Sequence, residues 1–399
     1  MVTIRTCTRS LRAHPHHADD PQGFRIHAAA IGIRDPTPDF CIIASDVPAR
    51  VAAVFTRSRF AGPSVHLSRA AAADGIARAL TVVSKNANVA TGERGTRDAE
   101  EVQARVARML AIDTEEVLIA STGVIGRPYP MDTIRAHLEQ LTWPPLSCAG
   151  FDDAARAIMT TDTRAKIVRT RIGNASLVGI AKGVGMIEPN MATLLAFFFT
   201  DAQLGDQAAV GFRHVMDRTF NCLSIDTDTS TSDTAALMWN GLAGPCPQPE
   251  FDSALHGVAL ALVKLIARDG EGASKLLQVT VSGARDYLQA KRAAKAIVNS
   301  PLVKTAVYGA DPNWGRVVMA LGKCEDDTDI DPARVTVWLG PVELYPAPAT
   351  AAALEAASAH LASPEVLIRA DLGVGGAEAT VYGCDLTEGY IGINAHYST

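Results

Sequence analysis

The sequence has little of what marks secreted, zinc-binding or membrane proteins. Its seven cysteines are scattered over 399 residues without a Cys-x-x-Cys pair, so we expect neither a disulfide framework nor a zinc cluster. The longest dense apolar run covers six residues, 194–199, whereas a membrane helix needs about 20. The first 20 residues contain arginine and histidine but no apolar stretch typical of a secretory signal. We therefore predict a soluble, cytoplasmic protein.

The sequence also lacks an excess of positive charge and a complete cofactor motif. The formal net charge is -6, which predicts neither nucleic acid nor an anionic membrane as a partner. Gly183-x-Gly185 lacks the third glycine of a dinucleotide-binding turn. Residues 327–331 hold three alternating aspartates, but Pro332 stands where a calcium-binding loop requires glycine. We therefore expect no metal and no organic cofactor.

Strand-like and helix-like segments alternate along the chain, which predicts a mixed α/β fold. The segments expected to form strands are 40–44, 79–83, 117–120, 194–199, 276–281, 335–339, 365–372 and 379–382. The segments expected to form helices are 96–110 with Thr96 as its N-cap, 130–141, 151–159, 206–219, 251–268, 285–298 and 350–361. Residues 241–250, rich in glycine and proline, predict a surface loop.

Thr193 lies between a turn-prone segment and a strongly apolar strand candidate. A threonine hydroxyl is a weak nucleophile unless a base is close, and the free amine of an N-terminal threonine can be that base. Such an amine has a pKa of roughly 7.7–8.0, which suits proton transfer near neutrality. Thr193 could gain one only by scission of the Ala192–Thr193 bond. On these residues alone, a β-forming threonine at the start of a strand remains the commoner explanation.

Four other features admit a functional and a plain structural explanation. Thr122-Gly123 follows a strand candidate and is either an oxyanion site or an ordinary turn. Lys182 either pairs with a substrate carboxylate or is solvated. Glu271 lies in a glycine-bearing segment that either binds an ammonium group or simply ends a helix. Residues 394–399 are typical of a frayed terminus.

Residues 182–197, KGVGMIEPNMATLLAF, closely resemble the self-processing motif of the ornithine acetyltransferase family. The resemblance covers about residues 23–399 and includes the segments 121–126, 160–163, 269–275 and 300–316. It implies that the chain cuts itself between Ala192 and Thr193, and that Thr193 is the nucleophile. It implies an oxyanion hole at Thr122 and Gly123. The substrate-binding residues implied by the resemblance are Thr161, Lys182, Thr193, Glu271, Asn394 and Thr399.

The resemblance also implies the reaction and the assembly. The expected activity is that of a glutamate N-acetyltransferase, which moves an acetyl group from N2-acetyl-L-ornithine to L-glutamate through an acetyl-Thr193 intermediate. Some members of the family also accept acetyl-CoA. The family fold is a mixed sandwich of β-sheets between helix layers, similar to N-terminal-nucleophile hydrolases. The expected products of cleavage are an α fragment, 1–192, and a β fragment, 193–399, which pair into an (αβ)2 heterotetramer.

Some details differ from the commonest pattern of the family. Val89-Ala90, Thr227 and Ser232 replace Ala-Cys, Gly and Asn. Together with residues 55–63 they resemble the ornithine acetyltransferases of clavulanic acid gene clusters. The alternative function is that of a self-processing N-terminal-nucleophile aminopeptidase or amidase. Those enzymes normally use serine, so Thr193 favours the acetyltransferase.

Overall fold

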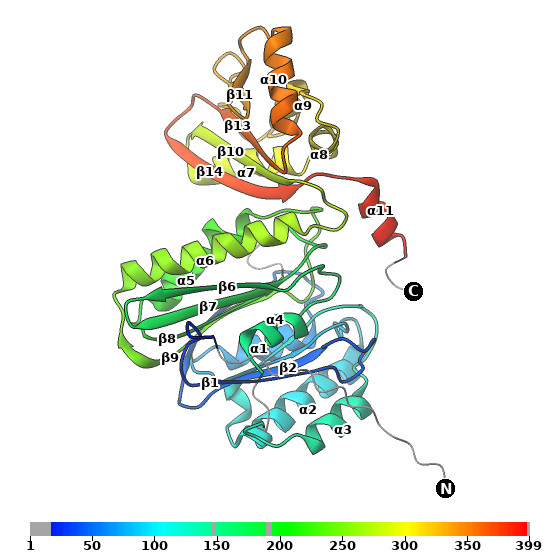
Figure 1. The fold of residues 1–399 in the computed structure, drawn as a ribbon, viewed down its shortest axis with the longest axis vertical. Coiled ribbons are helices and arrows are strands. Elements are labelled where there is room, and N and C mark those ends of the chain that lie inside the picture. Colours follow the sequence, from blue (N-terminus) through cyan, green and yellow to red (C-terminus); the bar gives the residue numbers. More distant parts are fainter. Residues whose placement is uncertain (1–16, 146–148, 189–193, 397–399) are drawn as a thin grey trace.

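The structure is a computed structural model that describes residues 17–145, 149–188 and 194–396. Within these ranges the strands form three sheets covered by helices (Figure 1). From bottom to top, Figure 1 shows a helical layer, the first sheet, the second sheet, another helical layer and a smaller unit built on the third sheet. This arrangement confirms the expected mixed α/β sandwich of sheets between helix layers.

The first sheet has the strand order β1-β2-β4-β5, with β4 and β5 parallel. Its strands are β1 (Phe24–Ala29), β2 (Phe40–Ser45), β4 (Ala79–Val83) and β5 (Val117–Ser121). Its outer face is covered by α2 (Gly92–Leu110) and α3 (Met131–Gln140), whose apolar side chains join those of Ile42 and Ile119 in one core. All residues of β2, β4 and β5 are buried, which explains their continuous apolar sequences.

The second sheet has the order β3-β9-β8-β7-β6 and carries the apolar strand candidate at its centre. Its strands are β3 (Arg50–Phe55), β9 (Thr234–Pro245), β8 (Leu195–Gln203), β7 (Ala175–Lys182) and β6 (Lys166–Ile172). Phe197 and Phe199 of β8 face the first sheet, while Phe198 faces α5 (Ala208–Arg218) and α6 (Gln248–Arg268). Burying each of these rings contributes about 2–3 kcal/mol.

Two shorter helices lie beside the sheets, and a third sheet completes the chain. Helix α4 (Phe151–Ala157) contacts strands of the first and the second sheet, and α1 (Pro63–Ala71) contacts β5 and β3. The third sheet has the order β12-β11-β13-β10-β14 and its own apolar core. Its strands are β10 (Leu276–Ala284), β11 (Thr336–Leu339), β12 (Val342–Tyr345), β13 (Glu365–Asp371) and β14 (Ala377–Cys384). Its helices are α7 (Tyr287–Val298), α8 (Pro301–Tyr308), α9 (Trp314–Leu321) and α10 (Ala351–Leu361). After β14, α11 (Glu388–Asn394) leads back toward the second sheet (Figure 1).

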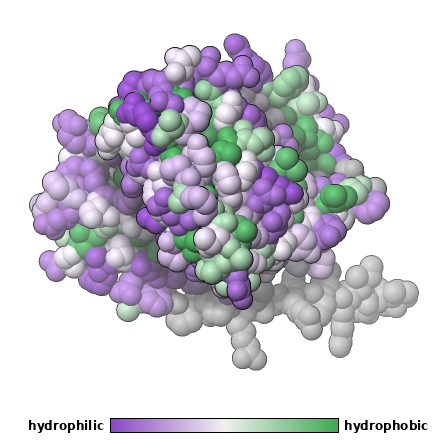
Figure 2. Space-filling view, turned by 90° about the horizontal axis from the view of Figure 1, so that it is seen from above, coloured by the Kyte–Doolittle hydropathy of each residue, from purple (hydrophilic) through white to green (hydrophobic). Residues whose placement is uncertain are grey.

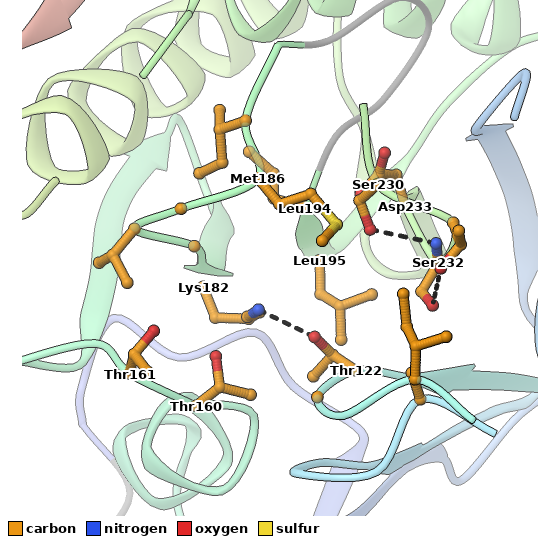
Figure 3. A pocket seen from close by; sticks show the side chains of 18 of the residues that line it. Thr122, Thr160, Thr161, Lys182, Met186, Leu194, Leu195, Ser230, Ser232 and Asp233 are labelled. Carbon is orange, nitrogen blue, oxygen red and sulfur yellow. Dashed lines mark hydrogen bonds between the residues drawn. The ribbon is translucent and has the colours of Figure 1, made fainter. Parts of the chain in front are cut away.

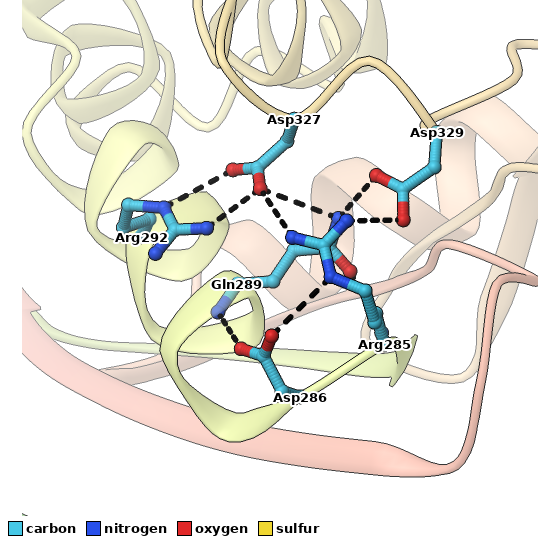
Figure 4. Close-up of polar contacts among 6 residues, drawn as sticks. All are labelled: Arg285, Asp286, Gln289, Arg292, Asp327 and Asp329. Carbon is cyan, nitrogen blue, oxygen red and sulfur yellow. Dashed lines mark hydrogen bonds and ion pairs between the residues drawn. The ribbon is translucent and has the colours of Figure 1, made fainter.

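The aspartate-rich segment of the third unit contacts arginines (Figure 4). Asp327 accepts hydrogen bonds from Arg292, with Oδ1 2.6 Å from Nη2, and from Arg285. Asp329 pairs with Arg285 and with Gln289. These carboxylates therefore join the segment to α7.

The face that carries α9 and α10, seen in Figure 2, mixes hydrophilic and hydrophobic residues.

The second sheet interleaves the two parts of the chain that lie before and after residue 193. Strands β8 and β9 pair in parallel with each other, while β7 flanks β8 and β3 flanks β9. Backbone hydrogen bonds therefore join both parts at two places within one sheet.

Among the described residues, no helix is long and apolar enough to cross a bilayer.

Two local expectations were wrong. Residues 241–250 are mostly not a loop: β9 runs to Pro245, where it pairs with Gln203, and α6 begins at Gln248. Positive φ angles at Gly241 and Gly244 let the strand continue through its glycines. Helix α2 begins at Gly92, four residues before the expected N-cap, and its N-cap residue is Thr91, whose hydroxyl donates to Asn88 Oδ1 and makes no capping bond.

Candidate active site

One pocket brings together six of the predicted site residues (Figure 3). It lies where β7 ends and β8 begins, between loops of all three sheets. The predicted residues that line it are Thr122, Gly123, Thr161, Lys182, Glu271 and Asn394. The other predicted residues, Ala192, Thr193 and Thr399, lie outside the described residues. The pocket wall includes Leu194, which follows Thr193 directly in the sequence.

The turn after β5 can form only with glycine at position 123. Gly123 has a φ of 130°, and a Cβ atom there would overlap the backbone of Lys85 and Asn86. The Thr122 amide donates to the Val83 carbonyl at 3.1 Å. Close backbone contact therefore fixes the turn and presents Thr122 to the pocket.

Lys182, the last residue of β7, points toward Thr122 (Figure 3). Its Nζ donates a hydrogen bond to Thr122 Oγ1 at 2.8 Å. Burial lowers the pKa of Lys182, and the negative charges of Asp162, Asp233 and Glu271 oppose that effect. A partly desolvated ammonium group beside a hydroxyl suits an anionic ligand or a developing negative charge.

Glu271 supplies the pocket with a carboxylate that two side chains hold in place. Its Oε1 accepts from Thr161 Oγ1 at 2.9 Å, and its Oε2 accepts from Asn394 Nδ2 at 2.8 Å. A Cβ atom at position 185 would overlap this carboxylate in its present position, so Gly185 leaves the space that the carboxylate occupies. The Glu271 amide also donates to the Val184 carbonyl at 2.9 Å. The chain's last helix and the loop after β7 thus meet at Glu271.

A buried ion triad supports the loops that carry Thr161 and Glu271. Lys166 Nζ lies 2.6 Å from Asp162 Oδ1 and 2.6 Å from Asp269 Oδ2, and its side chain has no exposed area. Asp162 also accepts from the Gly183 amide at 2.8 Å. Burial would raise the pKa of Asp162, but Lys166, Lys182 and these hydrogen bonds lower it below its ordinary value. The triad therefore ties both loops to β6.

Several pocket residues were not predicted from the sequence. Ser230, Ser232 and Asp233 line the side opposite Thr160 and Thr161, across Leu195 (Figure 3). The only sequence signal for Asp233 was an acidic residue at the end of a run of serine and threonine, which also fits an exposed turn.

Asp226, another residue that was not predicted, holds a backbone segment that lines the pocket. It accepts from the Met186 amide at 2.6 Å and from the Ile187 amide at 2.8 Å. Asp226 thereby holds the loop that precedes the expected cleavage site. Among the described residues, no group of three or more His, Cys, Asp or Glu side chains is placed to hold a metal ion.

The fold and the pocket define a mixed α/β enzyme whose site lies at the start of a buried central strand. The ArgJ family model matches residues 25–399. A Streptomyces clavuligerus protein named glutamate N-acetyltransferase Oat2 is 61% identical over 387 residues, covering 95% of this chain and 98% of its own. This chain belongs to the ArgJ family, which confirms the expected ornithine acetyltransferase resemblance and the acyltransferase class.

Two further proteins are similar to this chain. The arginine biosynthesis bifunctional protein ArgJ 2 of Nostoc sp. is 57% identical over 380 residues, covering 95% of this chain and 98% of its own. A crystal structure of the arginine biosynthesis bifunctional protein ArgJ from Bacillus halodurans has 35% identity and a TM-score of 0.47. The match covers 51% of this chain and 98% of the Bacillus halodurans chain.

Proposed function

We propose that this chain is a glutamate N-acetyltransferase that moves the acetyl group of N2-acetyl-L-ornithine to L-glutamate. The observation that carries the proposal is the presence of both Lys182 and Glu271 in one pocket beside Leu194. Both substrates are α-amino acid derivatives and bear a carboxylate. A half-buried ammonium group and a half-buried carboxylate in one pocket match their charges. The relative that is named glutamate N-acetyltransferase supports the same activity.

The reaction proceeds in two half-reactions through Thr193. The free amine of Thr193 takes the proton of its hydroxyl, and the oxygen attacks the acetyl carbonyl of N2-acetylornithine. The oxyanion that forms is stabilised by Thr122 and Gly123, and Lys182 orients the Thr122 hydroxyl through their 2.8 Å hydrogen bond. Ornithine leaves with a proton from the amine. Glutamate then attacks the acetyl-enzyme and restores the Thr193 hydroxyl.

In this proposal the remaining predicted residues bind substrate. Lys182 pairs with the substrate carboxylate, while Glu271, held by Thr161 and Asn394, receives an ammonium group. The terminal residue, Thr399, completes the set.

The proposal extends to the assembly and the setting of the enzyme. The α fragment, 1–192, and the β fragment, 193–399, stay joined through the interleaved second sheet and pair into an (αβ)2 heterotetramer. The enzyme works in the cytoplasm and serves arginine biosynthesis or a related secondary pathway.

Intact mass measurement tests the proposal. We expect the purified protein to consist of fragments 1–192 and 193–399, and the Thr193→Ala variant to stay uncut. Incubation with N2-acetylornithine should add one acetyl group to the 193–399 fragment, and L-glutamate should remove it. An uncut wild-type chain with full activity would refute the mechanism. Loss of the acetyl group to water at the same rate as to glutamate would favour the amidase instead.

A further inference from the structure

Asp233 is a buried acidic residue of the pocket to which the proposed reaction gives no role. It directly precedes β9, its side chain lines the pocket, and the residue is 1% exposed. Its Oδ2 atom is buried and has no hydrogen-bond partner among the described residues. In Figure 3 it lies beside Ser230 and Ser232, on the side of the pocket away from Thr161. A buried acceptor without a partner costs stability, which suggests that a ligand completes it.

The register of the second sheet places Asp233 next to the residue that follows Thr193. Leu195 of β8 pairs with Thr234 of β9, and the Thr234 amide donates to the Leu194 carbonyl at 2.9 Å. Leu194 and Asp233 directly precede these two neighbouring strands, whose backbones lie about 4.8 Å apart. The α-nitrogen of residue 193 is three covalent bonds from the Leu194 nitrogen, within about 4 Å. Leu194, which is bonded directly to residue 193 in the sequence, is therefore a neighbour of Asp233.

The charges around Asp233 favour the arrival of a cation. Burial raises the pKa of Asp233 well above its ordinary range, against smaller lowering effects of Ser230 and Lys182. Lys182 already donates to Thr122. A second positive group beside Asp233 would stabilise its carboxylate form, and an α-ammonium group is such a cation.

We propose that Asp233 is a positioning residue for the nucleophile: its carboxyl group binds the α-amino group that cleavage releases at residue 193. The inference rests on the proposed function. When the amine takes the proton of the threonine hydroxyl, the resulting ammonium pairs with the Asp233 carboxylate. The proton then leaves with ornithine, so that no other reactant is needed. Asp233 thereby fixes the orientation of the amine toward the hydroxyl that it activates.

The test compares Asp233→Asn with a matched control, Asp201→Asn. Asparagine keeps the shape of the side chain but removes its charge. Asp201 is also 1% exposed, at the far end of β8, but it accepts from the Ser176 amide at 2.7 Å and the Gln22 amide at 3.0 Å. Both variants are followed by intact mass, Tm, and kcat and KM as functions of pH.

For Asp233→Asn we expect complete cleavage, an unchanged KM and a fall in kcat of about 100-fold. A carboxylate stabilises the ammonium form, so its loss lowers the pKa of the amine. The acid limb of the kcat profile should therefore move to lower pH, by about one unit. In the uncut Thr193→Ala chain, where no amine has been released, the same change should leave the Tm equal or raise it, since Asp233 Oδ2 has no partner there among the described residues. Asp201→Asn should lower Tm and leave kcat and its pH profile unchanged.

The outcomes separate this inference from the proposed function. A wild-type protein that stays uncut or fails to transfer acetyl groups refutes the proposed function itself. A cleaved, active wild type with an Asp233→Asn variant of equal kcat and pH profile overturns only the role of Asp233. An uncut Asp233→Asn chain also overturns it, since the carboxyl group would then act before the amine exists. A drop in Tm with an unshifted pH profile would indicate a purely structural residue.

Discussion

Replacing Lys166 by methionine tests the ion triad beneath the pocket. Lys166 Nζ lies 2.6 Å from one oxygen each of Asp162 and Asp269, and the three side chains are at most 2% exposed. Without Lys166, two carboxylates remain buried, and breaking such a buried pair typically costs about 3–5 kcal/mol. Asp269 keeps Arg164 at 3.7 Å. We therefore expect a loss in the lower part of this range, about 3–4 kcal/mol.

This loss converts into a shift of the melting temperature. Unfolding entropy is about 2.1 cal/mol/K per residue, which gives roughly 0.8 kcal/mol/K for 399 residues. The Tm should therefore fall by about 4–5 °C. The assay is a calorimetric melt near pH 7 in the Thr193→Ala background, so that both chains are uncut and unfold as single polypeptides.

The pH dependence provides the internal check. The pKa of Asp162 is lowered in the folded protein, so its stabilising effect is present above the unfolded pKa and is lost as pH falls through the folded pKa. The deficit of Lys166→Met should therefore be greatest near neutrality and should shrink below about pH 4. Lys323→Met, at an exposed position, serves as the control and should not change the Tm. A shift below about 1 °C at neutral pH, or one that is independent of pH, would refute the reasoning.

Three further predictions concern the pocket. Gly123→Ala should lower the rate of acetyl transfer at least ~100-fold. The control is Gly126→Ala in the same turn, where φ is 83° and a Cβ atom would meet open space; it should lower the stability by only about 1 kcal/mol and keep the activity. Equal activities of the two variants would contradict the steric argument. Glu271→Gln should raise KM for N2-acetylornithine about 10–100-fold with little change in kcat, while Glu365→Gln, on an exposed pair, should match the wild type. Because burial lowers the pKa of Lys182 from 10.5, wild-type kcat/KM should decline with rising pH before an ordinary lysine titrates. Lys182→Met should lower kcat/KM about 100-fold and abolish this decline.

The sequence predicted several apolar strands but missed others, since the segments of β3, β7 and β9 are also largely apolar and were not expected to be strands. The buried strands β2, β4, β5 and β8 were expected because their runs are almost entirely apolar. Strand β6 carries Arg169 and Arg171 and was missed, although it pairs along its whole length with β7. Its strand conformation is determined by a neighbour and not by its own pattern.

The site was predicted where long motifs were present. The turn at Thr122-Gly123 and the residues Lys182 and Glu271 were found in this way, and the structure places them in one pocket. Asn394 required the family resemblance, because no local property of a polar terminus indicates that α11 returns to Glu271. Asp233 was missed, since burial of a carboxylate oxygen that has no partner among the described residues is a property of the folded chain and not of its sequence neighbours.

The interleaved second sheet limits when the proposed cleavage can occur during synthesis and folding. The pocket takes Thr122 from the first half of the chain, Asp233 and Glu271 from the second half, and Asn394 from near its end. A chain still being synthesised lacks β9, the parallel neighbour of β8, until translation has passed residue 245. The pocket beside the proposed cleavage site is therefore incomplete until β9 and Asn394 have been synthesised, and the proposal implies that cleavage follows the folding of a nearly full-length chain.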